Sequence, residues 1–108
     1  MATGYLIIQA RTAHNALPIS GVQIRIMDES ERRIYQGTTD ESGETEKIAL
    51  ETVDRSLSLD PDFTGTPFVS YNVLALADGF NSVHIVGIPI LEGETAIQPI
   101  ELIPMREA

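Results

Sequence analysis

Hydrophobic and polar side chains alternate along most of this chain, in short segments separated by turn residues. The alternation is cleanest over Val22–Ile26, and Leu6–Ala10 shows it again near the start. Because successive side chains of a strand point to opposite faces of a sheet, this period of two predicts β-strands. The expected strands are Leu6–Ala10, Val22–Ile26, Arg33–Thr39, Val69–Ala77, Asn81–Ile90 and Thr95–Ile103.

Turn residues mark where these strands end. The Asp40 side chain is expected to cap its own turn, with Gly43 at positive φ. Asp78-Gly79 predicts a tight turn between two neighbouring strands. The alternation is disturbed near Val86 and Gly87, which predicts a β-bulge.

Prolines and charged residues limit where some segments can lie. Pro89, Pro99 and Pro104 cannot donate a ladder hydrogen bond, so parts of the last two strands are expected at sheet edges or ends. The charged residues 28–32 have no apolar side chain to bury and are expected in a solvated turn.

The segment Glu44–Pro67 is ambiguous. Leu50, Val53 and Leu57 follow a helical spacing, which allows a short amphipathic helix over 45–57. The alternative is a seventh strand over 45–50 followed by a long loop, 51–67. Long loops without secondary structure are uncommon in small domains and are often functional.

About seven short strands with frequent turns predict an all-β fold: an antiparallel two-sheet sandwich of Greek-key type. The chain shows no internal repeat, no low-complexity tract and no linker composition. Residues 1–108 are therefore expected to form a single domain.

Four motifs follow one another in the order found in a known family. The chain resembles the carboxypeptidase regulatory-like domains, which are transthyretin-like β-sandwiches. The motifs are Gly4-Tyr5-Leu6-Ile7-Ile8, Leu17-Pro18-Ile19-Ser20-Gly21-Val22-Gln23-Ile24, Thr39-Asp40-Glu41-Ser42-Gly43 and Tyr71-Asn72-Val73 through Ala77-Asp78-Gly79-Phe80.

The last strand region, Thr95–Pro104, is similar to a version of this domain that accompanies peptidoglycan-binding and spore-cortex-associated proteins. The resemblance implies a non-catalytic accessory or structural module near a cell wall or spore envelope, with a protein or a cell-wall component as partner. It also favours a strand and then a loop after the Asp40 turn.

Composition and charge exclude several functions. The chain has no cysteine, so thiol catalysis, disulfides and cysteine-bound metals are ruled out. Sixteen acidic residues against seven basic ones give a net charge of −9, which repels nucleic acid and anionic lipid surfaces. The apolar runs are too short for membrane insertion. No cofactor-binding motif is present, and no cofactor is expected.

The long loop 51–67 holds the candidate partner surface: Asp60, Asp62 and Phe63. The two carboxylates are candidate calcium ligands, although no EF-hand spacing surrounds them. Phe63 is a candidate glycan contact, with a core-covering role as its structural alternative. A calcium- or glycan-binding module is thus the second functional hypothesis.

Catalysis is the third hypothesis. The chain has two histidines, His14 and His84, which are too few for a three-histidine zinc site and lack the close spacing of a two-histidine one. Surface positions are expected for both. The transthyretin-like fold includes a hydrolase of purine degradation, but the chain lacks that family's C-terminal Tyr-Arg-Gly-Ser. Pilin-like sandwiches carry Lys–Asn crosslinks between first and last strands. The single lysine, Lys47, lies outside both strands, so such a bond is not expected.

Overall fold

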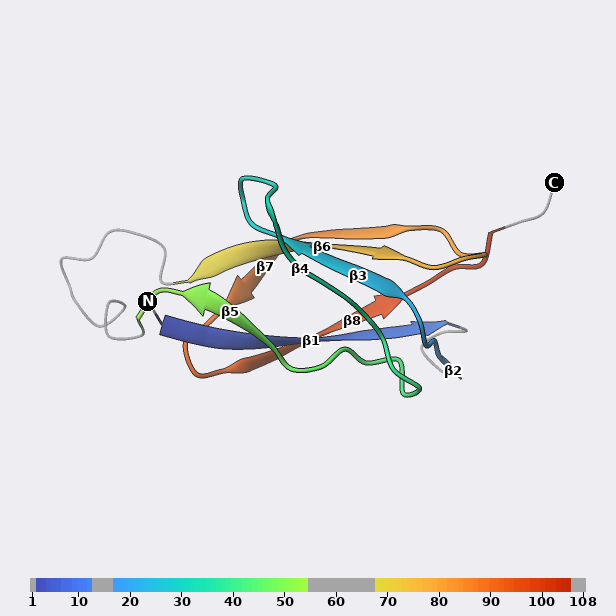
Figure 1. Cartoon of the computed structure of the whole chain (residues 1–108), viewed down its shortest axis with the longest axis horizontal. Coiled ribbons are helices and arrows are strands. Elements are labelled where there is room, and N and C mark those ends of the chain that lie inside the picture. Colours follow the sequence, from blue (N-terminus) through green and yellow to red (C-terminus); the bar gives the residue numbers. More distant parts are fainter. Residues whose placement is uncertain (1, 13–16, 55–67, 106–108) are drawn as a thin grey trace.

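Two β-sheets pack face to face in the computed structural model, which describes residues 2–12, 17–54 and 68–105 (Figure 1). Eight strands lie within these residues. In chain order they are β1 (Ala2–Thr12), β2 (Leu17–Pro18), β3 (Gln23–Met27), β4 (Arg33–Thr38), β5 (Ile48–Thr52), β6 (Val69–Leu76), β7 (Val83–Ile90) and β8 (Thr95–Glu101).

The first sheet is built around β1. On one side β1 pairs with β5 near its start and with β2 near its end, both antiparallel. On its other side β8 runs parallel to it, from the pair Tyr5 and Thr95 to the pair Arg11 and Glu101. The first and the last described strands are therefore neighbours that point the same way (Figure 1).

The second sheet has the order β4-β3-β6-β7, and all its pairs are antiparallel. The predicted bulge is present, because Asn72 of β6 faces two residues of β7, Val86 and Gly87. Gly87 has φ 79°, and its N–H donates to Asn72 Oδ1 at 3.1 Å. The predicted turn at Asp78-Gly79 is also present, with Gly79 at φ 83° and Phe80 N–H bonded to Ala77 O.

The core lies between the sheets and takes alternate residues of each long strand. Strand periodicity thus accounts for its composition. Its fully buried members include residues from both sheets: Leu6, Ile8, Ala10, Val22, Ile24, Ile26, Val73, Ala75, Ile90 and Leu102.

The all-β sandwich predicted from the sequence is confirmed, with three differences. A two-residue strand, β2, raises the count to eight because Leu17 and Pro18 pair with the end of β1. The pair β1 and β8 is parallel, whereas the other strand pairs of the described chain are antiparallel. Strands β7 and β8 each have one ladder partner, so Pro89 and Pro99 lie on edge strands as expected.

The third difference concerns residues 45–57. The helical alternative is wrong over the described part, residues 45–54, because β5 covers Ile48–Thr52. The expected boundary between strand and loop is also wrong: Glu51 and Thr52, placed in the loop 51–67 by the sequence, belong to β5. They pair with Thr3 and Ala2, since β1 starts earlier than its alternation indicated.

Buried threonines complete the ladders where regular pairing stops. Thr39 accepts from Val22 N–H and donates to Ile19 O, and Thr45 accepts from Ile8 N–H. Both are 5% exposed. Each hydroxyl satisfies backbone groups that would otherwise be buried without a partner.

Thr52 and Tyr71 join the two sheets to one another. Thr52 is fully buried; its hydroxyl donates to Ile90 O at 2.6 Å and accepts from Val69 N–H at 3.2 Å. The Tyr71 hydroxyl donates to Glu51 O at 2.6 Å. Burial, followed by the nearby Glu51 carboxylate, raises the pKa of Tyr71. These bonds connect β5 of one sheet with β6 and β7 of the other.

Candidate functional site

Most of the residues singled out from the sequence lie outside the described residues. These are Asp60, Asp62, Phe63 and His14. The calcium- or glycan-binding hypothesis for their loop therefore stays a prediction. His84 is exposed on β7, opposite Leu74 of β6.

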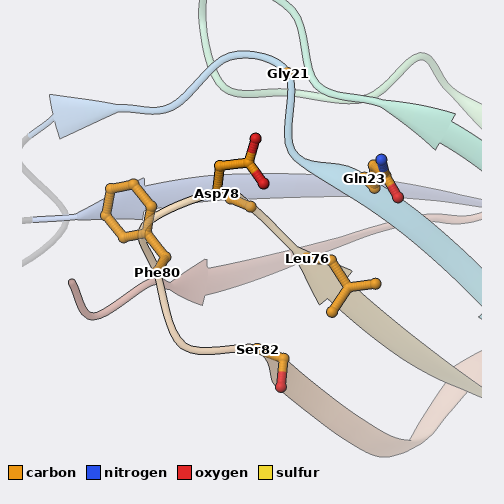
Figure 2. Close-up of a pocket in the computed structure, with 7 residues that line it drawn as sticks. Gly21, Gln23, Leu76, Asp78, Phe80 and Ser82 are labelled. Carbon is orange, nitrogen blue, oxygen red and sulfur yellow. The ribbon is translucent and has the colours of Figure 1, made fainter. Parts of the chain in front are cut away.

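A surface hollow of about 360 Å³ lies at one end of the second sheet (Figure 2). The direct pairing of Gln23 on β3 with Leu76 on β6 forms one part of its wall. The turn after β6 supplies Asp78 and Phe80, and Ser82 lies just before β7. Gly21 and Ala77 complete the lining.

The hollow offers groups suited to binding polar molecules. Figure 2 shows the Asp78 carboxylate, the Gln23 amide and the Ser82 hydroxyl spaced around it, with the Phe80 ring at one side. The ring packs partly against the core, and its backbone forms a bridge with Pro104. Contacts of its ring and of its backbone thus hold Phe80 in place. The arrangement supplies one carboxylate and neutral hydrogen-bonding groups.

Two loops rich in acidic residues use their first aspartate to hold the loop itself. In the turn 28–32, Asp28 Oδ1 accepts from the N–H groups of Ser30 and Arg32, each at 2.9 Å. Asp40 Oδ1 accepts in the same way from Ser42 and Glu44 N–H. The capping role predicted for Asp40 is therefore confirmed.

The hydrogen bonds also alter the acidity of Asp28. The Arg32 N–H, assisted by the Ser30 N–H and the Arg32 guanidinium at 3.2 Å, lowers the pKa of this carboxyl. Among the described residues, no cluster of three or more histidine, aspartate or glutamate side chains could hold a metal ion. The acidic turns are thus explained by local structure.

Two further acidic side chains, Glu44 and Glu46 before β5, hydrogen-bond to residues of β1 and β4. Glu44 Oε2 accepts from Gln9 Nε2 at 2.8 Å, and Glu46 accepts from the Tyr35 hydroxyl at 3.2 Å. Burial, with the Glu46 carboxylate, raises the pKa of Tyr35. Lys47 lies with its ammonium 4.5 Å from the centre of the Tyr5 ring, a cation–π contact.

Comparison with known proteins identifies the fold. No family of known proteins matches the chain, and no curated protein is found as a relative. Solved structures similar to the chain include two that cover almost its whole length. The chain is 15% identical to the Bacillus anthracis TIE protein, with a TM-score of 0.63, covering 96% of this chain and 17% of that protein.

The second similar structure is the minor pilin of the gram-positive pathogen Streptococcus agalactiae. It is 15% identical with a TM-score of 0.65, covering 99% of this chain and 47% of the pilin. The chain thus spans less than half the length of either protein. At this identity the likeness establishes a shared β-sandwich fold. Within the described residues, no helix is long and apolar enough to cross a membrane.

The sequence contained part of the signal for the hollow. Asp78, Gly79 and Phe80 stand out as a turn followed by an aromatic residue. However, Gly21 and Gln23 come from a segment more than fifty residues earlier. Only the pairing of β3 with β6 brings them to the same place.

Proposed function

We propose that this chain is a non-catalytic structural module of a bacterial cell-surface protein. The observation that carries the proposal is the parallel arrangement of its first and last strands. Because β1 and β8 point the same way, the start of β1 and the end of β8 lie at opposite ends of the sandwich (Figure 1). A module of this kind separates whatever is joined to its two ends.

Two further observations support the proposal. The fold is shared with a minor pilin of a gram-positive pathogen. The motif resemblance independently implies an accessory module near a cell wall or spore envelope. A partner in this setting would be a protein or a cell-wall component, and the net charge of −9 favours a partner with basic groups.

Surface labelling tests the proposal. Antibodies raised against this chain are expected to label intact cells of the source organism, and brief treatment of those cells with an added protease is expected to remove the label. A cytosolic protein detected in parallel, which must remain protected, controls for cell lysis. Label that appears only after lysis would contradict the proposal.

A further inference from the structure

The pairing of β1 with β8 has a mechanical consequence. We infer that β1 and β8 form a hydrogen-bonded clamp through which this module carries tension applied along its length. The biological use of the clamp rests on the proposed structural role. The clamp itself is a property of the folded chain and is measurable without that role.

The direction of the two strands determines how force reaches their hydrogen bonds. Tension on the start of β1 and on the end of β8 pulls two parallel neighbours past one another along their axes. The bonds between them then share the load and must break together. If the same two strands are pulled apart from the ends where both begin, the bonds open one at a time. Forced unfolding is governed by the unfolding barrier, so the first geometry resists a higher force.

Additional contacts secure both ends of the clamp. At the beginning, Tyr5 N–H donates to Glu94 O and Gly93 N–H donates to Thr3 O, each at 2.9 Å. At the far end, Leu102 N–H donates to Arg11 O at 2.8 Å, and the Thr12 hydroxyl donates to Leu102 O at 2.7 Å. Sliding of the strands therefore breaks bonds at both ends of the ladder as well.

The core resists the same movement. Leu6, Ile8 and Ala10 on β1 are fully buried, and Ile100 of β8 and Leu102, which follows that strand, are at most 2% exposed. Sliding by one residue would turn each buried side chain toward solvent, because successive residues of a strand face opposite sides.

Strand β8 is the part of the clamp that yields first. Within the described residues it has one ladder partner, β1, whereas β1 is also held by β5 and β2. Beyond β8 the chain is held by a bridge to the turn after β6: Asn81 N–H donates to Ile103 O, and Met105 N–H donates to Gly79 O. Tension applied to the chain beyond β8 therefore loads this bridge first.

Only alternate residues of β8 direct their N–H groups toward β1, which explains why a proline is tolerated in this strand. The bonds from Tyr5 N–H to Glu94 O and from Leu102 N–H to Arg11 O belong to one parallel ladder. In such a ladder alternate residues of each strand face the partner. Even-numbered residues of β8 therefore bond to β1, and the nitrogen of Pro99 faces the free edge. The proline blocks pairing with another chain without weakening the clamp.

The clamp is held by hydrogen bonds and packing. The only lysine, Lys47, contacts the Tyr5 ring, and β8 contains no asparagine, so β1 and β8 cannot form a Lys–Asn crosslink between them. A module clamped in this way extends at high force and recovers when the force is removed.

The experiment compares two pulling directions on one folded chain. Because the chain has no cysteine, pairs of introduced cysteines provide unique attachment points. Thr3→Cys with Met105→Cys loads the strands in shear, and Thr3→Cys with Thr95→Cys opens them from one end. All three positions are exposed. The shear pair is expected to unfold at a several-fold higher force at the same loading rate, lengthening the tether by about 300 Å. Equal forces in the two directions would overturn the clamp.

Two proline variants identify the bonds that carry the force. Gln98→Pro removes an N–H that faces β1, and Ile97→Pro removes one that faces the free edge. The unfolding force in shear is expected to fall for Gln98→Pro and to stay near the parent value for Ile97→Pro. An equal fall for both would contradict the assignment of the bonds. Circular dichroism verifies that each proline variant is folded. If a proline variant does not fold, the comparison of the two pulling directions still tests the clamp.

Repeated stretching and intact mass test the reversibility. The chain is expected to refold after relaxation and to unfold again at the same force, with a mass equal to that of its sequence. A mass lower by one ammonia, or a chain that cannot be extended, would show a covalent crosslink and overturn a hydrogen-bonded clamp. Surface labelling is independent of these results, so failure of the clamp and failure of the proposed function are distinguishable.

Discussion

At the scale of single residues, two turns with the same hydrogen bonds place different residues at the same strained position. Glu31 in the first turn has φ 64°, and Gly43 in the second has φ 77°. Glu31 is exposed, whereas a Cβ on Gly43 would lie 2.5 Å from Ala10 O. The second turn therefore requires glycine for space as well as for backbone conformation, and the first does not.

This difference predicts opposite effects of two substitutions. Glu31→Gly is expected to stabilise the fold by about 0.5 kcal/mol, because relief of the left-handed strain exceeds the entropy cost of glycine. Gly43→Ala is expected to destabilise it by about 2 kcal/mol or more, since a side chain meets both the strain and the Ala10 carbonyl. Urea unfolding of the two variants beside the parent chain checks both signs. A stabilising Gly43→Ala would refute the steric argument.

The Asp28 carboxylate predicts a pH dependence. Its folded pKa lies below the usual 3.8, so its ionised form stabilises the fold above that pH. The contribution is lost as the pH falls through the folded pKa. Asp28→Asn, which keeps one oxygen acceptor but no charge, is expected to be less stable than the parent at neutral pH and to match it in stronger acid. Thermal unfolding of both chains across this range measures the difference. A constant difference between them would contradict the role of the charge.

At the scale of strands and sheets, the Thr52 hydroxyl is the buried connection between β5 and the opposite sheet. Thr52→Val keeps the shape of the side chain but leaves Ile90 O and Val69 N–H without this partner. It is expected to cost about 1–3 kcal/mol of stability. Thr38→Val on the exposed edge strand β4 is the matched control and is expected to change stability by less than about 0.5 kcal/mol. Similar losses for both would show that Thr52 is not a connection between the sheets.

The sequence predicted the strands better than it predicted their partners. Alternation identified the long strands because burial of one face sets a period of two. It could not identify β2, which has two residues, or the direction of β8, because pairing with β1 depends on residues far apart in the chain. The extension of β5 to Thr52 was missed for the same reason, since its partner is the very start of β1.

At the scale of the whole molecule, the sequence predicted the local turns of the candidate site but not how they come together. The Asp78-Gly79 turn and the capping by Asp40 were predictable, because turn chemistry is local. The hollow was not, because its walls come from β3 and from the turn after β6, which only the folded sheet brings together. Part of the acidic excess has a structural use in the fold, because the carboxylates of Asp28, Asp40 and Glu44 accept specific hydrogen bonds.

The position of β8 also determines when the protein can fold. The bonds that β8 and Leu102 make to β1 join residues up to 91 positions apart, so the first sheet stays incomplete until these residues have left the ribosome. Such long-range pairing makes folding slow, because the chain loses the entropy of closing a long loop before the stabilising contacts form. Until then the central strand exposes one edge and the apolar face that Ile100 and Leu102 later cover. The nascent chain is therefore most open to aggregation or chaperone binding just before its last strand is made.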